Sequence, residues 1–213
     1  MIVKRIVAGP VMTNCYIAWN EDTRDGFIVD PGDDAQKIIS VIGDLKIKYI
    51  FVTHGHFDHI LAIADVKAHT GADVVIHEED KECLTDARKS LLHHFFNSLA
   101  GFKSVEADII VHDGEVFECA GETLKIIHTP GHSRGSYCID TGEHLFTGDT
   151  LFEDDCGRCD LPGGDYGTIL RSLKLLHDLE GDRKVYPGHD VTTTLERERK
   201  LNRNMLEAME RLS

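Results

Sequence analysis

One short stretch of the chain, residues 53–59 (Thr-His-Gly-His-Phe-Asp-His), concentrates side chains that bind metals. Imidazole nitrogens and carboxylate oxygens are the usual protein ligands of zinc, iron and manganese. Because alternate residues at a strand end point the same way, His54 and His56 are expected to aim at one point. Asp58 and His59 follow the bend and are expected to aim at a second point nearby. The alternative, a polar loop that happens to be rich in histidine, would be costly to bury without a metal.

The residues on either side of this stretch predict what positions it. Residues 49–52 (Tyr-Ile-Phe-Val) have the β-branched and aromatic character of a buried strand. Residues 60–66 (Ile-Leu-Ala-Ile-Ala-Asp-Val) are typical of a helix. The candidate ligands are therefore expected on a strand-to-helix loop, where rigid elements hold side chains for chemistry.

Three later turns repeat one construction, in which an apolar strand is followed by glycine and then by histidine or aspartate. The turns are Pro130-Gly131-His132, Gly148-Asp149 and Pro187-Gly188-His189. Glycine allows the backbone to turn and to approach another segment closely. Taken singly, each histidine or aspartate is better explained as a turn or capping residue. Together with the first stretch, they predict one site where several strand ends converge.

Strand and helix patterns come in two runs, each of strands with helices. Strands are predicted over 2–7, 11–19, 25–29, 48–52, 74–76, 108–111, 115–119, 122–127, 135–139, 143–147 and 184–186. Helices are predicted over 34–42, 59–69, 165–179 and 192–212, with one or two more in 78–103. This order favours an α/β fold with two sheets packed face to face and helices outside. No linker divides the chain, so we expect a single domain over residues 1–213.

The segment 78–103 is polar, with apolar residues at helical spacing. We interpret it as an amphipathic cover over the domain, with a lid over the site as the alternative. His93 and His94 lie within it and are expected to be surface histidines rather than ligands.

Composition and charge disfavour several classes of partner. Of the 213 residues, 41% are hydrophobic and 28% are charged, as in ordinary soluble domains. The net charge of −14 disfavours nucleic acid as a partner. No apolar run approaches the roughly 20 residues of a membrane span, so no membrane partner is expected. Residues 1–7 are too short and too charged for a signal peptide, so a cytoplasmic location is expected.

The six cysteines are expected to be free thiols, because no export signal accompanies them. Cys156 and Cys159 have Cys-x-x-Cys spacing, which also occurs in redox pairs and in half of a zinc knuckle. No second pair completes a four-cysteine site, so free thiols are the favoured interpretation.

With these motifs the sequence resembles the metallo-β-lactamase superfamily, and it is most similar to the glyoxalase II-like hydrolases. The resemblance covers nearly the whole chain. It is carried by residues 53–59, Gly131-His132, Gly148-Asp149 and 187–189, and also by 13–16 (Thr-Asn-Cys-Tyr), 29–32 (Val-Asp-Pro-Gly) and 157–164 (Gly-Arg-Cys-Asp-Leu-Pro-Gly-Gly). It implies a four-layer αββα sandwich with metals at one edge.

The resemblance also implies a dinuclear site built from seven histidine and aspartate side chains. One metal would be held by His54, His56 and His132, the other by Asp58, His59 and His189, and Asp149 would bridge the two. Zinc is the expected metal, with iron or manganese as alternatives, because His and Asp sets accept all three. The implied reaction is hydrolysis of a small-molecule thioester such as S-lactoylglutathione by metal-bound hydroxide, in a monomer or homodimer.

Three residues are expected to have further roles in the site. Asp58 is expected to take the proton of the attacking water as a catalytic residue. Asp30 is expected to orient a ligand imidazole, with a turn cap before Pro31-Gly32 as the alternative. Arg158 is expected to bind a substrate carboxylate, with a structural salt bridge as the alternative.

The sequence departs from glyoxalase II in places that concern the substrate. Gly55 stands where those enzymes have a further histidine, and Asp190-Val191 replace a tyrosine that follows their last metal histidine. Only 24 residues follow His189, so their glutathione-binding helical domain is not expected. These differences leave the thiol and the acyl group open.

Three other activities on the same fold compete with this one. A sulfur (persulfide) dioxygenase would use one iron held by two histidines and one aspartate. A nuclease would need an RNA-binding domain, and a diiron flavoprotein would replace a motif histidine with glutamate and carry a flavin domain. The presence of all seven candidate ligands favours the hydrolase.

Overall fold

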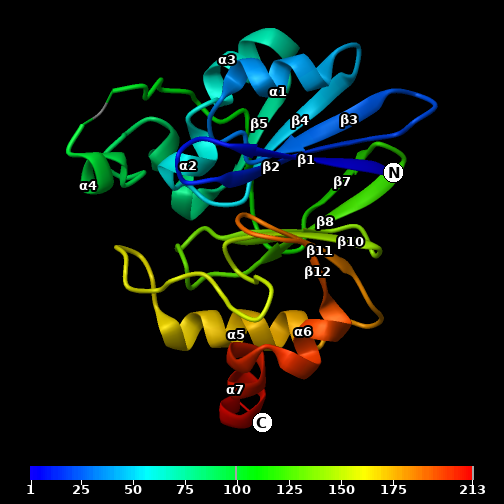
Figure 1. The fold of residues 1–213 in the computed structure, drawn as a ribbon, viewed down its shortest axis with the longest axis vertical. Helices are drawn as coiled ribbons and strands as arrows, with labels where there is room; N and C mark the ends of the chain where they lie inside the picture. Colours follow the sequence, from blue (N-terminus) through cyan, green and yellow to red (C-terminus); the bar gives the residue numbers. More distant parts are fainter. Residues whose placement is uncertain (99, 213) are drawn as a thin grey trace.

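The computed structural model describes residues 1–98 and 100–212 as two six-stranded sheets packed face to face (Figure 1). Helices cover the outer face of each sheet, above and below in the view of Figure 1. The α/β fold and the αββα sandwich expected from the sequence are thereby confirmed.

The first sheet has the strand order β1-β2-β3-β4-β5-β6. Its strands are β1 (Ile2–Ala8), β2 (Thr13–Trp19), β3 (Asp25–Val29), β4 (Lys46–Val52), β5 (Asp73–His77) and β6 (Ile109–Val111). The pairs from β1 to β3 are antiparallel, and those from β3 to β6 are parallel. Strands covered on both faces read as continuous apolar runs, which is why residues 49–52 of β4 are all apolar.

The second sheet has the order β12-β11-β10-β9-β8-β7. Its strands are β7 (Val116–Cys119), β8 (Glu122–His128), β9 (Tyr137–Asp140), β10 (His144–Gly148), β11 (Lys184–Pro187) and β12 (Thr193–Thr194). Only β10 and β11 run parallel among its described pairs. That parallel pair brings the ends of β10 and β11 to the same edge.

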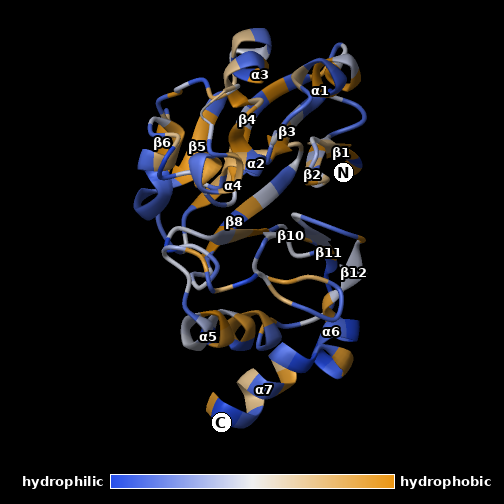
Figure 2. Ribbon diagram, turned by 60° about the vertical axis from the view of Figure 1, so that its left-hand side comes forward, coloured by the Kyte–Doolittle hydropathy of each residue, from blue (hydrophilic) through white to orange (hydrophobic). Residues whose placement is uncertain are grey.

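Apolar side chains fill three interfaces, one between the two sheets and one between each sheet and its helices. Between the sheets the core is aromatic, with edge-to-face pairs such as Phe27–Phe51 at 5.6 Å between ring centroids. Above the first sheet lie α1 (Ala35–Ile42) and α3 (Ile63–Thr70), which bury Ile38 and Ile63. Below the second sheet lie α5 (Tyr166–His177), α6 (Leu195–Leu201) and α7 (Arg203–Leu212). Figure 2 shows the apolar residues gathered along the strands of the first sheet and on α5.

The predicted helix over 59–69 is in fact two helices, α2 (Phe57–Ile60) and α3. The break falls at Ala62, whose N–H donates to the carbonyl oxygen of Pro31 at 3.0 Å instead of continuing α2. Asp58 and His59 therefore lie on a short helix, while His54 and His56 remain in the loop before it.

Two longer helix predictions were wrong in extent. Segment 78–103 contains a 3₁₀-helix, η1 (Glu78–Leu84), and the short α4 (Leu92–Phe96), and Leu99 of its apolar pattern lies outside the described residues. The predicted helix over 192–212 is β12, α6 and α7, because Asn202 leaves the helical conformation. Its side-chain amide donates to the carbonyl oxygen of Asp155 at 2.9 Å, and its Oδ1 accepts the N–H of Met205 at 3.1 Å. None of the helices in the described residues has the length and apolar character needed to cross a membrane.

Candidate metal centre

Four chain segments meet at one edge of the two sheets and carry all seven predicted ligands. His54 and His56 follow β4, and α2 carries the next two ligands. His132 lies in the loop after β8. Asp149 and His189 follow the parallel strands β10 and β11, which pair through Gly148 and Pro187. The sandwich thus gathers side chains that are up to 135 positions apart in the sequence (189 minus 54).

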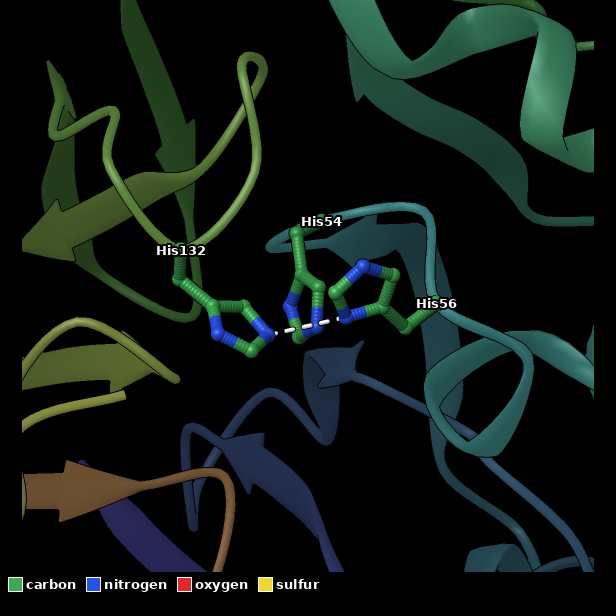
Figure 3. A group of neighbouring side chains, drawn as sticks. All are labelled: His54, His56 and His132. Atoms are coloured by element: carbon green, nitrogen blue, oxygen red, sulfur yellow. Dashed lines mark hydrogen bonds between the residues drawn. The ribbon is translucent and has the colours of Figure 1, made fainter. Parts of the chain in front are cut away.

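The first group consists of His54, His56 and His132, whose rings face one another from two segments (Figure 3). One ring nitrogen from each lies within 4.8 Å of the others. Nε2 of His132 is 2.8 Å from Nδ1 of His56. Two ring nitrogens this close require a shared proton or a cation between them, so this geometry suits a metal.

The second group consists of Asp58, His59 and His189. Oδ2 of Asp58 lies 3.2 Å from Nε2 of His189 and 3.4 Å from Nε2 of His59. Asp149 lies between the two groups. Its Oδ2 is 3.4 Å from Nε2 of His132, and its Oδ1 is 3.5 Å from Nε2 of His59.

Three buried atoms at this point have no hydrogen-bond partner among the described residues. They are Nε2 of His54, Nε2 of His59 and Oδ1 of Asp149. Buried polar atoms are almost always paired, so three orphans in one place call for a missing partner. Two ligands of a tetrahedral ion at bond lengths of about 2.1 Å lie about 3.4 Å apart, which matches the separations here. The donor set therefore fits bound metal ions.

Hydrogen bonds at Nδ1 of three candidate histidines determine that Nε2 of each ring faces the candidate metal centre. Nδ1 of His59 donates to Oδ2 of Asp30 at 3.0 Å, and Nδ1 of His132 donates to the carbonyl oxygen of Arg158 at 2.8 Å. Nδ1 of His54 is 3.2 Å from Oγ1 of Thr53, which itself donates to Asp30 at 2.6 Å. Each contact leaves Nε2 free to bind a metal. The hydrogen bond from a candidate ligand imidazole to Asp30, which the expected orienting role requires, is present.

The electrostatics of the two groups differ. In the first, burial and neighbouring histidines lower the pKa of His54 and bring that of His56 to about 3. Both imidazoles are therefore neutral and offer lone pairs, as metal ligands must.

In the second group the carboxylates dominate. Burial alone would lower the pKa of His59, but Asp58, Asp149 and Asp30 raise it to about 10. Burial alone would raise the pKa of Asp58, but His59 and His189 hold it below its ordinary value. Without a metal, a proton on His59 balances the carboxylates, and a metal ion would take over that positive charge.

A cavity of about 400 Å³ opens onto this centre, and we call it the metal-side cavity. Five of the candidate ligands line it, together with apolar side chains from two loops and α4. Phe95 and Phe96 of α4 are 46% and 51% exposed and pack against the buried ring of Phe57. The cavity therefore joins a polar floor to apolar walls, the usual make-up of a small-molecule site.

Arg158 lines the same cavity, but its guanidinium already has a partner. Nε and Nη2 donate to the two carboxylate oxygens of Asp160, each at 2.7 Å. The structural salt bridge that was the alternative for Arg158 is present, and its backbone carbonyl oxygen orients His132.

Two glycines mark places where side chains would not fit. A Cβ on Gly188 would lie 2.2 Å from Oδ1 of Asp149, so only glycine lets β11 deliver its histidine here. A Cβ on Gly55 would lie 2.4 Å from Cβ of Cys83 in η1. The packing of η1 on the ligand loop thus explains why this chain has glycine where glyoxalase II has histidine.

Other predictions about reactive side chains can also be compared with the structure. All six cysteines are unpaired, which confirms the expectation of free thiols. His93 and His94 are exposed on α4 and belong to none of the candidate metal groups found in the described residues.

Sequence analysis missed Asp80, a buried residue of η1 that ties two ligand loops together. Its Oδ2 accepts the N–H of Gly55 at 2.9 Å and the hydroxyl of Ser133 at 2.6 Å. Its Oδ1 accepts the N–H of Gly135 at 2.9 Å. One carboxylate therefore holds the loop of His54 and His56 against the loop of His132. No sequence signal separates it from the neighbouring acidic residues.

We expect Asp80→Asn to destabilise the protein by about 1–3 kcal/mol, because an amide leaves at least one buried donor facing an N–H group. Urea unfolding of the metal-loaded protein measures this change, and Glu79→Gln, an exposed neighbour, is the control. Equal stability of the two variants would contradict the role of Asp80.

The chain is similar to known proteins over most of its length. The family model described as Metallo-beta-lactamase superfamily matches residues 8–189. A protein of Aquifex aeolicus with no assigned function is 33% identical, over 95% of this chain and 96% of its own length. The hydroxyacylglutathione hydrolase GloC of Haemophilus influenzae is 32% identical, over 89% of this chain and 91% of its own length.

Two solved structures are similar over nearly all of both chains. The BLEG-1 B3 metallo-beta-lactamase superposes with a TM-score of 0.88 at 31% identity, covering 96% of this chain and 99% of that one. TTHA1623, solved in a di-iron-bound form, has a TM-score of 0.81 at 28% identity, covering 94% and 98%.

Proposed function

The chain belongs to the metallo-beta-lactamase superfamily, and from that premise we propose that it is a metal-dependent hydrolase of small-molecule thioesters such as S-lactoylglutathione. The observation that carries the proposal is the convergence of seven histidine and aspartate side chains, with three orphaned atoms, at the floor of a partly apolar cavity. The similarity to GloC supports the choice of a thioester.

His54, His56 and His132 would hold one metal ion, and Asp58, His59 and His189 would hold the other, with Asp149 between them. We propose zinc, because its preferred ligands and distances match this set, and the di-iron form of TTHA1623 makes iron the alternative. When bound, such metals supply a nucleophile from water near neutral pH and positive charge for the developing oxyanion.

The chain's own residues position the reaction. Oδ2 of Asp58 faces His59 and His189 and accepts the hydroxyl of Thr13 at 2.8 Å. Oδ1 of Asp58 has no hydrogen-bond partner in residues 1–98 and 100–212, and this carboxylate lines the metal-side cavity. Oδ1 is therefore the atom proposed to accept the proton of the attacking water. Phe95, Phe96 and Val11 form apolar walls that displace water around the thioester.

The alternative is a persulfide dioxygenase with a single iron. Such a site needs two histidines and one aspartate. Here a second complete set, Asp58, His59 and His189, lies beside the first group, which favours the dinuclear hydrolase.

Purified protein with quantified metal is expected to hydrolyse S-lactoylglutathione, and the release of glutathione measures this. The panel should include a β-lactam, given the similarity to a B3 metallo-beta-lactamase. Two bound metals per chain and thioester turnover would support the proposal. Oxygen uptake with glutathione persulfide, one iron per chain and no thioester turnover would reject it.

A further inference from the structure

A second cavity, of about 540 Å³, opens beside the metal-side cavity. His56 lines both cavities. Helix α4 forms a wall between them, since His93 and His94 line the second cavity while Phe95 and Phe96 line the first. The two cavities therefore adjoin at His56.

Two arginines in this cavity have unused binding capacity. Arg88, Lys89 and Arg134 are its cationic lining residues, so we call it the basic cavity. Lys89 is engaged, because it forms an ion pair with Glu82. The guanidinium groups of Arg88 and Arg134 form no hydrogen bond or ion pair with any residue that the structure describes. Each offers five N–H donors in a planar fork.

Two of the three acidic residues that line the basic cavity already have partners of their own. Glu82 is paired with Lys89, and the carboxylate of Asp80 accepts three hydrogen bonds from the ligand loops. Glu79 is the third acidic lining residue, so the three acidic and the three cationic lining residues balance in formal charge. On a chain with a net charge of −14, this balanced lining repels an anion less than most of the surface does, and the two open guanidinium groups supply hydrogen-bond donors for it.

The position of Arg134 connects these donors to the reaction. It follows His132 by two residues, so their Cα atoms are at most about 7 Å apart. The other arginine near the site, Arg158, is held by both oxygens of Asp160. Arg88 and Arg134 therefore line the basic cavity, whereas Arg158 lines the metal-side cavity on the other side of α4.

We propose that the basic cavity binds an anionic group, carboxylate or phosphate, on the thiol half of the thioester. Arg88 and Arg134 would donate the hydrogen bonds that hold this group. The inference rests on the proposed hydrolase function. In that reaction the oxygen of water bonds to the acyl carbon, the carbon–sulfur bond breaks, and the sulfur leaves as thiolate and takes up a proton. The half that is anchored in the basic cavity is released as the thiol, while the acyl group becomes a carboxylate. Arginine suits this task because its fork binds carboxylate or phosphate oxygens in pairs.

The test compares an anionic with a neutral thiol carrier in the metal-loaded protein. For the double variant Arg88→Gln/Arg134→Gln, we expect KM for S-lactoylglutathione to rise about 10- to 100-fold, as loss of charged hydrogen bonds implies. KM for the neutral S-lactoyl-N-acetylcysteamine and kcat for both substrates should stay within about twofold. Arg203→Gln is the matched control, because this exposed arginine of α7 lines neither cavity. An equal rise for both substrates, or no rise, would overturn the proposal.

A binding measurement tests the proposed anion binding in the basic cavity independently of the proposed hydrolase activity. S-methylglutathione, whose sulfur cannot become a thiolate, probes carboxylate binding by calorimetry, and desulfo-coenzyme A probes phosphate binding. We expect one of them to bind the unmodified protein and to lose at least about tenfold in affinity in the double variant. The ligand that binds identifies the anion. If no thioester is hydrolysed but this result holds, only the proposed function fails; if neither ligand binds, the basic cavity has no such role.

Discussion

Replacing Asp149 with alanine is expected to reduce the metal content of the purified protein below two ions per chain and to lower thioester turnover by about a thousandfold or more. Asp149 lies between the two candidate groups, with one oxygen 3.4 Å from Nε2 of His132 and the other 3.5 Å from Nε2 of His59. Removing it takes a negative charge from between the proposed metals. A loss of about 4 kcal/mol in transition-state stabilisation, the scale of a metal's contribution, corresponds to about a thousandfold in rate.

The measurement combines elemental analysis of dialysed protein with turnover of the thioester. Asp73→Ala is the matched control, since that aspartate is exposed at the start of β5. It should keep both metals and full activity. Circular dichroism checks that Asp149→Ala remains folded. A folded variant that retains two metals and near-normal turnover would show that Asp149 does not bridge the site.

The seven candidate ligands could be recognised in the sequence because their chemistry is a property of residue type. Histidines and aspartates crowded behind an apolar strand have few stable arrangements without a metal. Glycines before His132, Asp149 and His189 add a second signal that is also local. The sequence did not show how close the segments lie to one another. The parallel pairing of β10 and β11 and the packing of the two sheets bring them together.

Helix extent was less predictable for a physical reason. Within the apolar spacing over 78–98, Leu84, Ala87 and Leu92 are buried, but Phe95 and Phe96 are exposed beside the metal-side cavity. The spacing also carries no information on how the backbone hydrogen bonds are arranged. Leu91 and Asn97 adopt positive φ angles of 66° and 47°, which limit α4 to five residues.

Partner choice among charged residues was the least predictable feature. Arg158 pairs with Asp160 only two positions away, and the sequence allowed that pair as an alternative. Arg88 and Arg134 had no motif to mark them, and their free guanidinium groups emerge only from the folded chain. In the same way, Asp80 is distinguished from Glu79 by contacts with Ser133 and Gly135, more than fifty positions away.

Replacing Asp58 with alanine should also lower turnover strongly, by about 10²- to 10⁴-fold, the range attributed to a positioned proton acceptor. Two roles converge on this side chain, because Oδ2 faces His59 and His189 while Oδ1 has no hydrogen-bond partner among the described residues, and the carboxylate lines the metal-side cavity. The pKa of Asp58 lies below its ordinary value, because the two neighbouring histidines outweigh the effect of burial. Its carboxylate is therefore ionised at neutral pH, as both roles require.

Comparison at equal metal content separates the two roles. Asp58→Ala and Asp58→Asn should be assayed after reconstitution with metal, with Thr13→Val as the control for the hydrogen bond to Oδ2. Loss of that single bond should cost about 1 kcal/mol, or about fivefold in rate. If Asp58 accepts the proton, Asp58→Asn stays slow even when two metals are bound, because an amide has no basic oxygen. A fully loaded Asp58→Asn variant with near-normal turnover would leave Asp58 as a ligand alone and would place the proton acceptor elsewhere in the site.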